Sequence, residues 1–398
     1  MNDLTCIIIG GGHVGLGALK AIKEETRDMS NGRRIRFVLI DKQSGHMRKM
    51  LLFRPAVGQE DIMIPWTHYS FSEGVEFVQG TVTSIDSKGK HIQYEDSQGN
   101  HARMQYDLLV VAVGSMVRRP DPDQGGIALT DLQTAADIRE RWRANLSKAV
   151  GQTNSVERKR LMTVAVAGAG ISGVETSAEL AIEMQKEASS LGLNPSDISV
   201  YLLSGQERLF LEGPDRVGRK LEQILSECGV TVLYNRKVMQ EEAGLVTLSN
   251  GDRLPVGLCV WTIGLIPNPA LRTMGLPLTP GGQVLVDECY RVKGASGVYS
   301  IGDCARVVDP RNGKADLMRC GEGGLQADRL GKIMMADLEG RSAPVHKSPS
   351  SILDFFCIGL GENRGLVWGR KWGLNMIITG KLAWKIRQLA WDAGSKLR

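Results

Sequence analysis

The chain has 398 residues, 42% of them hydrophobic and 23% charged, with a formal net charge of +5. This composition is typical of a folded protein rather than a disordered one, and the length predicts two or three domains. A membrane-spanning helix needs about 20 apolar residues, and no run approaches that length. Gly10 interrupts the first apolar run too early for a signal peptide. We therefore expect a cytoplasmic protein, or one bound peripherally to the cytoplasmic face of a membrane.

The first glycine-rich turn lies between a strand pattern and a helix pattern near the N-terminus. Three glycines in G-x-G-x-x-G spacing follow the apolar run over residues 6–9. Glycines at these positions allow a tight turn, close approach of the backbone to a pyrophosphate, and close packing of helix on strand. The helix N-terminus then offers N–H donors to the phosphates. We assign to this first nucleotide site Gly10, Gly12, His13, Val14 and Gly15.

An acidic residue follows the second predicted strand. Residues 35–40 form an apolar strand pattern that ends at Asp41, where a carboxylate accepts the ribose hydroxyls in dinucleotide-binding folds. Alternating patterns that follow predict antiparallel strands. The apolar pattern over residues 106–115 predicts a further strand of the same sheet, which ends in small residues. We assign to the same site Asp41, Lys42, Val82, Ala112 and Gly114.

A second glycine-rich turn repeats this arrangement 158 positions later. Its three glycines follow the apolar run over residues 164–167 and precede another helix pattern. One such fingerprint is weak evidence, but two of them predict that one protein holds two dinucleotides, which favours electron transfer between nucleotide cofactors. We assign to the second site Gly168, Gly170, Gly173 and, at the end of a later strand pattern, Gly264.

Ser204 ends the strand pattern over residues 198–204, at the place where enzymes that prefer NADH usually carry a carboxylate. Serine neither rejects a 2′-phosphate nor binds two ribose hydroxyls strongly, and Arg208 is placed to pair with a phosphate. In the alternative reading, Gln206 or Glu207 replaces the carboxylate through a shift of the loop. We assign Ser204 to the second site, and the sequence leaves NADH and NADPH open, with NADH slightly favoured.

These motifs, in this order, resemble the FAD-dependent pyridine nucleotide oxidoreductases with two dinucleotide-binding domains. The resemblance covers residues 4 to about 340 and includes the late pair Gly302 and Asp303. It implies an α/β fold of two Rossmann-like domains, with FAD on the first unit and NADH or NADPH on the second, inserted unit. It also implies that Asp303 bonds the FAD ribityl chain, and Gly302 and Gln326 join the expected cofactor contacts. The expected division is 1–117 and 267–345 for the FAD domain, 118–266 for the NAD(P) domain, and 346–398 for a C-terminal region.

Glu175 follows the second fingerprint and resembles the glutamate at this place in type II NADH dehydrogenases and apoptosis-inducing-factor-like reductases. The resemblance implies a catalytic residue near the meeting point of nicotinamide and flavin, where a carboxylate relays a proton or orients the nicotinamide amide. The alternative is a helix N-terminal charge with no role in the reaction.

The cysteines separate this chain from the disulfide reductases of the same superfamily, which carry C-x-x-x-x-C shortly after the FAD ribose acid. Residues 42–55 contain no cysteine, and none occurs between Cys6 and Cys228. The sequence therefore excludes a two-thiol relay, and we expect the flavin to pass electrons directly to the acceptor. No Cys/His cluster has metal-ligand spacing, so we expect no metal. Cys320 is expected to be a packing residue, with a reactive thiol as the alternative.

The C-terminal tail is basic and rich in tryptophan. Residues 364–398 contain eight basic residues, one acidic residue and four of the seven tryptophans. At about 100° per residue, one helical stripe is expected to dock on the body: Leu382, Ala383, Ile386, Leu389, Ala390 and Ala393. The opposite side is expected to meet a lipid headgroup layer through Trp384 and Trp391, flanked by Lys381, Lys385 and Arg387. A partner subunit, in a homodimer, is the alternative, and we expect no nucleic acid.

The tail also resembles the end of type II NADH dehydrogenases and of related quinone-reducing proteins, over residues 355–367 and 379–384. The quinone-site motif A-Q-x-x-x-Q-Q would fall on residues 320–326, where only Gln326 matches. The resemblance implies an NAD(P)H oxidoreductase that passes hydride to FAD and electrons to a quinone, as a peripheral membrane protein. The alternatives are a soluble reductase of a small electron-carrier protein, a flavin oxidase or monooxygenase, and a redox scaffold.

Overall fold

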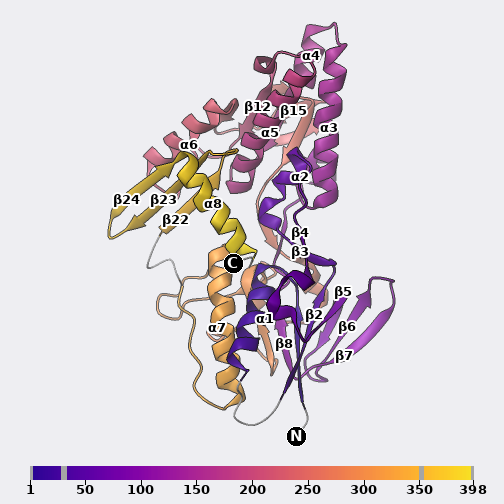
Figure 1. The fold of residues 1–398 in the computed structure, drawn as a ribbon, viewed down its shortest axis with the longest axis vertical. Helices are drawn as coiled ribbons and strands as arrows, with labels where there is room; N and C mark the ends of the chain where they lie inside the picture. The colour runs from indigo at the N-terminus through magenta and orange to yellow at the C-terminus, as the bar shows by residue number, and fades with distance from the viewer. Residues whose placement is uncertain (1–2, 28–33, 349–353, 396–398) are drawn as a thin grey trace.

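A seven-stranded sheet forms the centre of the first unit in the computed structural model, which describes residues 3–27, 34–348 and 354–395 (Figure 1). The strand order is β20-β8-β1-β2-β5-β6-β7, and β20, β8, β1, β2 and the start of β5 are parallel. The strands are β1 (Leu4–Ile9), β2 (Ile35–Asp41), β5 (Val75–Asp86), β6 (His91–Asp96), β7 (His101–Gln105), β8 (Leu108–Val111) and β20 (Val298–Ser300). Helices α1 (His13–Glu25) and α7 (Cys320–Leu338) pack against each other beside this sheet.

The second unit is built on a five-stranded parallel sheet of order β10-β17-β11-β12-β13. Its strands are β10 (Ile127–Ala128), β11 (Thr163–Ala167), β12 (Ser199–Leu203), β13 (Val230–Leu233) and β17 (Leu258–Trp261). Its helices are α3 (Leu132–Val150), α4 (Ser155–Leu161), α5 (Ile171–Ser190) and α6 (Asp215–Glu227), and a small antiparallel sheet holds β14 (Val238–Glu242), β15 (Leu245–Leu248) and β16 (Arg253–Pro255).

Two short antiparallel strands join the units. The outgoing strand β9 (Ser115–Val117) pairs with the returning strand β18 (Leu265–Pro267). The second unit is therefore an insertion between β8 and β20 of the first sheet.

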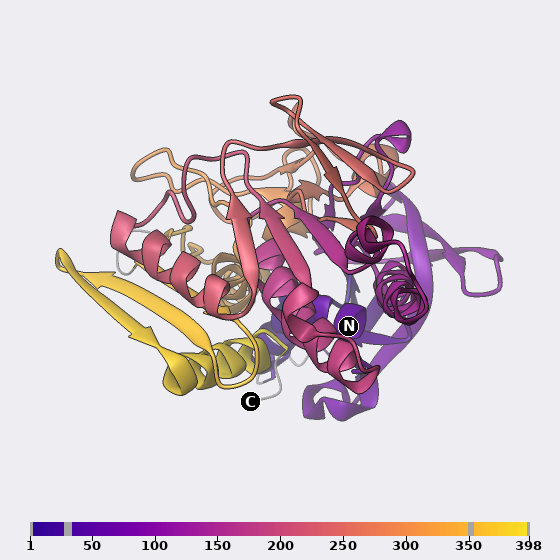
Figure 2. The same ribbon diagram turned by 90° about the horizontal axis from the view of Figure 1, so that it is seen from above.

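A C-terminal unit contacts both of the others (Figures 1 and 2). It consists of an antiparallel sheet of β22 (Asp354–Gly359), β23 (Gly365–Lys371) and β24 (Leu374–Thr379), followed by α8 (Gly380–Gly394). The rings of Phe356 and Trp368 contact that of Phe210 in the second unit, Phe356 at a tilt and Trp368 edge to face, with centroids 4.2 and 5.4 Å from that of Phe210. At the end of α8, the Arg48 guanidinium pairs with Asp392 at 3.0 Å. The C-terminal unit thus ties the two nucleotide units together.

The core follows from apolar runs that are buried on both faces of each parallel sheet. Cys6, Ile7, Ile8 and Ile9 of β1 are at most 3% exposed. Helix α7 begins at Cys320, where the Glu322 carboxylate accepts the backbone N–H groups of Leu317 and Arg319 and so caps the helix.

The prediction for the faces of α8 is wrong in part, since Ala383 is buried as expected and Ile386 and Ala390 pack beside it, but other residues of the two faces differ from the prediction. Trp391 is buried against Phe53, with ring centroids 6.0 Å apart, and the Arg387 guanidinium lies 5.2 Å from its ring. Leu382 and Leu389, expected to dock, are 58% and 50% exposed. This orientation buries the Trp391 ring against Phe53 and brings the Arg387 guanidinium to its acidic partner Glu175. Docking through Leu382 and Leu389 would provide neither contact. In the part of the chain that the structure describes, no helix is long and apolar enough to cross a bilayer.

Candidate functional site

Both fingerprint turns have geometry that only glycine tolerates. Gly10 and Gly168 begin the turns with φ of +101° and +112°, in the left-handed region. A Cβ on Gly15 would overlap the carbonyl oxygen of Gly10, and a Cβ on Gly173 would overlap that of Gly168. These four glycines therefore allow each turn and let each helix approach its strand.

The middle glycine of each fingerprint faces open space. A Cβ on Gly12 or Gly170 would meet no protein atom within 4 Å. These residues are the N-caps of α1 and α5, and neither helix receives a side-chain cap. The uncapped N–H donors, the positive end of the helix dipole and the bare backbone together fit a pyrophosphate at each turn. The two sites thus fit two dinucleotides.

Asp41 lies at the carboxyl end of β2, beside the first turn. Its Oδ2 accepts the Gly11 N–H at 2.6 Å and its Oδ1 accepts the Gln43 N–H at 2.7 Å, which fixes the carboxylate in position for a ribose. Burial raises the pKa of Asp41 although these hydrogen bonds oppose the shift. Lys42 is exposed, and Val82 is buried within β5, three residues beyond the residue that pairs with Asp41.

Two aromatic side chains that sequence reasoning missed support the first turn. The Trp66 ring covers Gly11 so closely that a Cβ there would overlap it. The buried His46 places its Nδ1 3.0 Å from the Gly11 carbonyl oxygen. Both residues come from a hairpin, β3 (Gly45–Met47) and β4 (Met63–Pro65) with the turn after it, that carries no recognisable motif.

Lys49 and Asp303 both contact Ser115, the residue at which the chain leaves the first sheet after β8. Ser115 Oγ donates to Asp303 Oδ2 at 2.6 Å, and the Lys49 ammonium donates to the Ser115 carbonyl at 2.7 Å. Burial lowers the pKa of Lys49 and raises that of Asp303, while each opposes the shift of the other. Gly114 adjoins them with open space beside it and φ of +66°. Sequence reasoning noted that residues 42–55 lack a thiol pair but did not single out Lys49 in that segment.

The remaining contacts predicted for the first site meet at the start of α7. Val14 packs against Gly302 and Gly323, and the carbonyl of Ala112 lies over Gly10. His13 approaches Gly324, at 3.2 Å from the place of a Cβ there. The N-terminal turns of α1 and α7 therefore converge on the Gly302–Asp303 pair.

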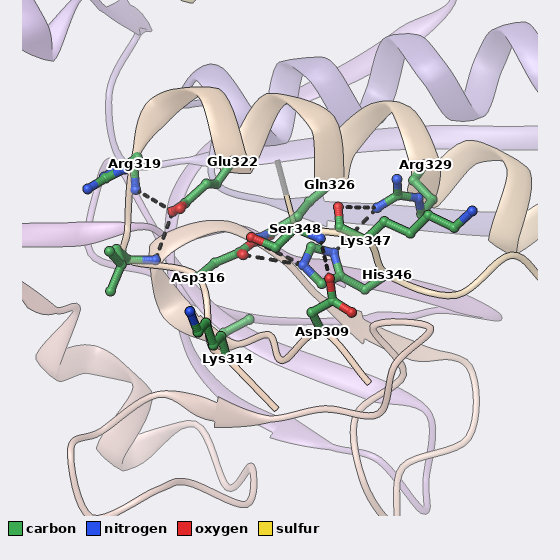
Figure 3. A network of polar contacts seen from close by, with 12 residues as sticks. Asp309, Lys314, Asp316, Arg319, Glu322, Gln326, Arg329, His346, Lys347 and Ser348 are labelled. Atoms are coloured by element: carbon green, nitrogen blue, oxygen red, sulfur yellow. Dashed lines mark hydrogen bonds and ion pairs between the residues drawn. The ribbon is translucent and has the colours of Figure 1, made fainter. Parts of the chain in front are cut away.

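Gln326 links the Gly302 turn to a polar network in which Asp316 and His346 also take part (Figure 3). Its Oε1 accepts the Gly302 N–H at 2.7 Å, and its Nε2 donates to Asp316 at 2.8 Å. Asp316 lies 3.2 Å from His346 Nε2, and the His346 Nδ1 contacts the Tyr290 hydroxyl at 2.9 Å. Burial raises the pKa of Asp316, but hydrogen bonds from His346 and Gln326 outweigh it, so the pKa is lowered. This network fixes the Gly302 turn and the segment that leads to the C-terminal unit.

At the second site, Ser204 is buried and its hydroxyl accepts the Gln206 N–H at 3.1 Å. Gly264 has φ of +93° and open space at its Cβ position. Arg208, expected from the sequence as a phosphate partner, instead donates to three carbonyls, those of Phe210, Leu211 and Gly213, at 2.9 to 3.1 Å. The N–H donors of the Arg208 guanidinium are thus engaged by carbonyl groups of its own loop.

Glu175, in the first turns of α5, is 1% exposed and bound on both oxygens. Arg387 donates to Oε1 at 2.8 Å and to Oε2 at 3.0 Å, and the Gly359 N–H donates to Oε1 at 2.9 Å. Burial lowers the pKa of Arg387, but the charge of Glu175 more than offsets this, and the pKa is raised. The structure therefore joins Glu175 to the C-terminal unit, a contact that the sequence did not predict. Its catalytic role stays a prediction.

All seven cysteines lie in the described parts of the chain and are free, and Cys320 alone among them is exposed. No group of His, Cys, Asp or Glu residues within the described ranges forms a metal site.

Residues 4–324 match the family described as pyridine nucleotide-disulphide oxidoreductase. A type II NADH:quinone oxidoreductase of Mycobacterium tuberculosis is 25% identical over 362 residues, which cover 86% of this chain and 74% of that protein. A protein of Dictyostelium discoideum named "Probable NADH dehydrogenase" is 27% identical over 240 residues, 58% of this chain, and the match spans 53% of that relative.

Solved structures show the same fold. NDH2 from Plasmodium falciparum, in complex with NADH, superposes with a TM-score of 0.79 at 17% identity, over 98% of this chain and 94% of that one. A ferredoxin reductase from Rhodopseudomonas palustris has a TM-score of 0.67 at 19% identity, over 95% and 91%. The predicted fold class is confirmed, as are FAD and a nicotinamide nucleotide as the cofactors. The chain belongs to the pyridine nucleotide-disulphide oxidoreductase family.

Proposed function

We propose that this protein is an FAD-dependent NAD(P)H:quinone oxidoreductase that works at a membrane surface. The observation that carries the proposal is the pair of open glycine turns, at Gly12 and Gly170, in a chain whose seven cysteines are all free. FAD, when bound, accepts a hydride from the nicotinamide nucleotide and gives up two electrons to a second acceptor. The quinone is inferred from relatives that are named as quinone oxidoreductases.

The residues of the first site divide the work of holding FAD. The N-terminus of α1 at Gly12 would hold the pyrophosphate, Asp41 the adenosine ribose, and Asp303 the ribityl chain. The half-buried Lys49, fixed by the Ser115 carbonyl, would place a positive charge near the flavin. Such a charge favours the anionic form that a flavin takes on reduction.

The C-terminal unit carries an exposed apolar surface with basic residues beside it. Its most exposed large side chain, Trp372, is 89% exposed, and the Lys371 ammonium lies 4.6 Å from the centroid of its ring. The other exposed apolar residues of this C-terminal apolar surface are Phe355, Leu374, Met376, Leu382 and Leu389, and Lys381 and Lys385 are exposed on the same helix as the last two. Apolar side chains interspersed with basic ones fit an anionic lipid surface. This surface replaces the tryptophan face that the sequence predicted.

Comparing acceptors tests the proposed activity. The protein, loaded with FAD and reduced anaerobically by NADH or NADPH, is mixed with a short-chain ubiquinone, with a small ferredoxin, or with oxygen. We expect the quinone to reoxidise the flavin fastest. Faster reoxidation by the ferredoxin or by oxygen would contradict the quinone proposal.

Vesicle sedimentation tests the membrane surface. We expect the wild type to sediment with vesicles that contain phosphatidylglycerol, and the double variant Trp372→Ser/Leu374→Ser to lose most of that binding. Val156, 72% exposed in the second unit, provides the control Val156→Ser. Equal sedimentation of all three proteins would contradict the assignment of the surface.

A further inference from the structure

The carboxyl end of β12, where the adenosine ribose of the second nucleotide would lie, is fixed by backbone pairing. The Arg236 N–H donates to the Ser204 carbonyl at 2.8 Å, and the Asn235 N–H donates to the Gln206 carbonyl at 3.0 Å. With the Ser204 hydroxyl bound to the Gln206 N–H, the turn is held at three points. A shift of the loop that would bring Glu207 into the place of the missing carboxylate must break these bonds.

Lys237 lies directly across this turn. Its Cγ, Cδ and Cε atoms are 3.0, 3.4 and 2.8 Å from the place that a Cβ of Gly205 would take. Glycine at position 205 therefore leaves the room in which the lysine stem runs. The lysine is exposed, and no acidic partner of its ammonium is found among the residues that the structure describes.

Arg236 adds a second cation at the same strand end. Its Nε lies 3.7 Å from Asp252 Oδ2, an exposed contact that solvent screens. Its Nη1 donates to the Asn235 carbonyl at 3.3 Å. Asp252 is thus paired with Arg236, and Glu207 lies beyond the fixed turn.

We propose that Lys237, with Arg236, binds the adenosine 2′-phosphate of NADPH, so that the second site prefers NADPH to NADH. In dinucleotide-binding folds a carboxylate at this strand end holds the ribose hydroxyls of NADH, and a nearby cation accommodates the 2′-phosphate of NADPH. Here Ser204 carries no charge that would repel the phosphate, and two cations stand beside it. The inference rests on the proposed function only in taking the second fingerprint as the nicotinamide nucleotide site.

Binding of nucleotide fragments tests the inference without any turnover. Isothermal titration of the full-length, FAD-loaded protein compares 2′,5′-ADP with 5′-AMP, which differ by the 2′-phosphate alone. A charge-assisted contact predicts about tenfold tighter binding of 2′,5′-ADP. Lys237→Gln is expected to abolish this difference and to leave the affinity for 5′-AMP unchanged.

Two further variants control the experiment. Lys159→Gln changes an exposed lysine that precedes β11, at the amino end of the same sheet, and is expected to bind both fragments as the wild type does. Glu207→Gln is expected to leave the ratio of affinities unchanged. A rise of that ratio in Glu207→Gln would overturn the inference, because Glu207 would then be the discriminating residue.

The two proposals fail in different ways. If 5′-AMP binds as tightly as 2′,5′-ADP, or if Lys237→Gln keeps the difference, the 2′-phosphate inference is wrong, whatever the acceptor is. If the fragments bind as expected but neither NADPH nor NADH reduces the flavin, the inference on the binding site holds and the proposed function is wrong.

Discussion

The buried ion pair between Glu175 and Arg387 is predicted to hold the C-terminal unit on the second unit. The two side chains are 2% and 10% exposed, and Arg387 contacts both oxygens of the carboxylate. Arg387→Met would leave the buried carboxylate with the Gly359 N–H as its remaining partner. Breaking a buried pair by removing one partner costs about 3–5 kcal/mol, because the remaining charge stays desolvated.

Hydrogen exchange is the assay for this cost, because it reports local opening of the C-terminal unit while the cofactor domains stay folded. At 1.4 kcal/mol for each factor of ten, exchange in β22 and α8 is expected to accelerate by a factor of at least about 100. Lys385→Met, an exposed change on the same helix, serves as the control and is expected to leave exchange unchanged.

A double-mutant cycle with Glu175→Gln isolates the pair. Because the two residues are in direct contact, we expect a coupling free energy of about 1–3 kcal/mol. The reasoning that this ion pair holds the C-terminal unit in place would be refuted by either of two results. One is equal protection from hydrogen exchange in Arg387→Met and Lys385→Met, and the other is a coupling free energy of zero.

Three other predictions concern the nucleotide sites and the network behind Gly302. Gly170→Ala is expected to keep the thermal midpoint and lose nucleotide affinity, because its Cβ meets no protein atom within 4 Å, whereas Gly173→Ala is expected to lower the midpoint; equal midpoints in a melting curve would contradict this. The pKa of Asp316 is lowered in the folded protein, so ionised Asp316 stabilises the fold at a pH above its unfolded-state pKa of about 4. This stabilisation is lost as the pH falls through the folded-state pKa. Melting curves of Asp316→Asn between about pH 6 and pH 3 should therefore show a smaller acid-induced loss of stability than the wild type, and an equal loss would count against the network. Lys49→Met is expected to lower the reduction potential of bound FAD by about 30 mV or more, since about 1.4 kcal/mol corresponds to that shift in a two-electron couple; Lys159→Met, an exposed change in the second unit, should leave the potential as it is.

The fold and the first site could be predicted because their signals are local in the sequence. The turns at Gly10 and Gly168 combine a buried strand, a glycine spacing and a helix within a few residues, so the pattern itself specifies the geometry. Asp41 stands at the end of β2, where strand ends meet at one edge of a parallel sheet, whereas Asp303, three residues beyond β20, was implied by the family resemblance. Each of these residues could be placed without knowledge of distant contacts.

The residues that were missed act through contacts between distant parts of the chain. Lys49 meets Ser115, 66 positions away, and Arg387 meets Glu175, 212 positions away. For α8, the face that docks combines Ala383 from the stripe expected to dock with Arg387 and Trp391 from the side expected to meet lipid, so the helical period alone did not locate it. The orientation of α8 depends on the buried ion pair between Arg387 and Glu175 on α5, and the helical periodicity of the sequence carries no information about that contact.

The electron count of the flavin tests the central claim most directly, namely that electrons pass through the flavin without a protein thiol. The FAD-loaded protein is titrated anaerobically with NADPH or NADH, and a short-chain quinone is then added. We predict that one equivalent of nucleotide per FAD completes the bleaching of the flavin absorbance, and that one equivalent of quinone restores it. Uptake of a second equivalent of nucleotide before the end point would reveal a reducible thiol pair and contradict the account.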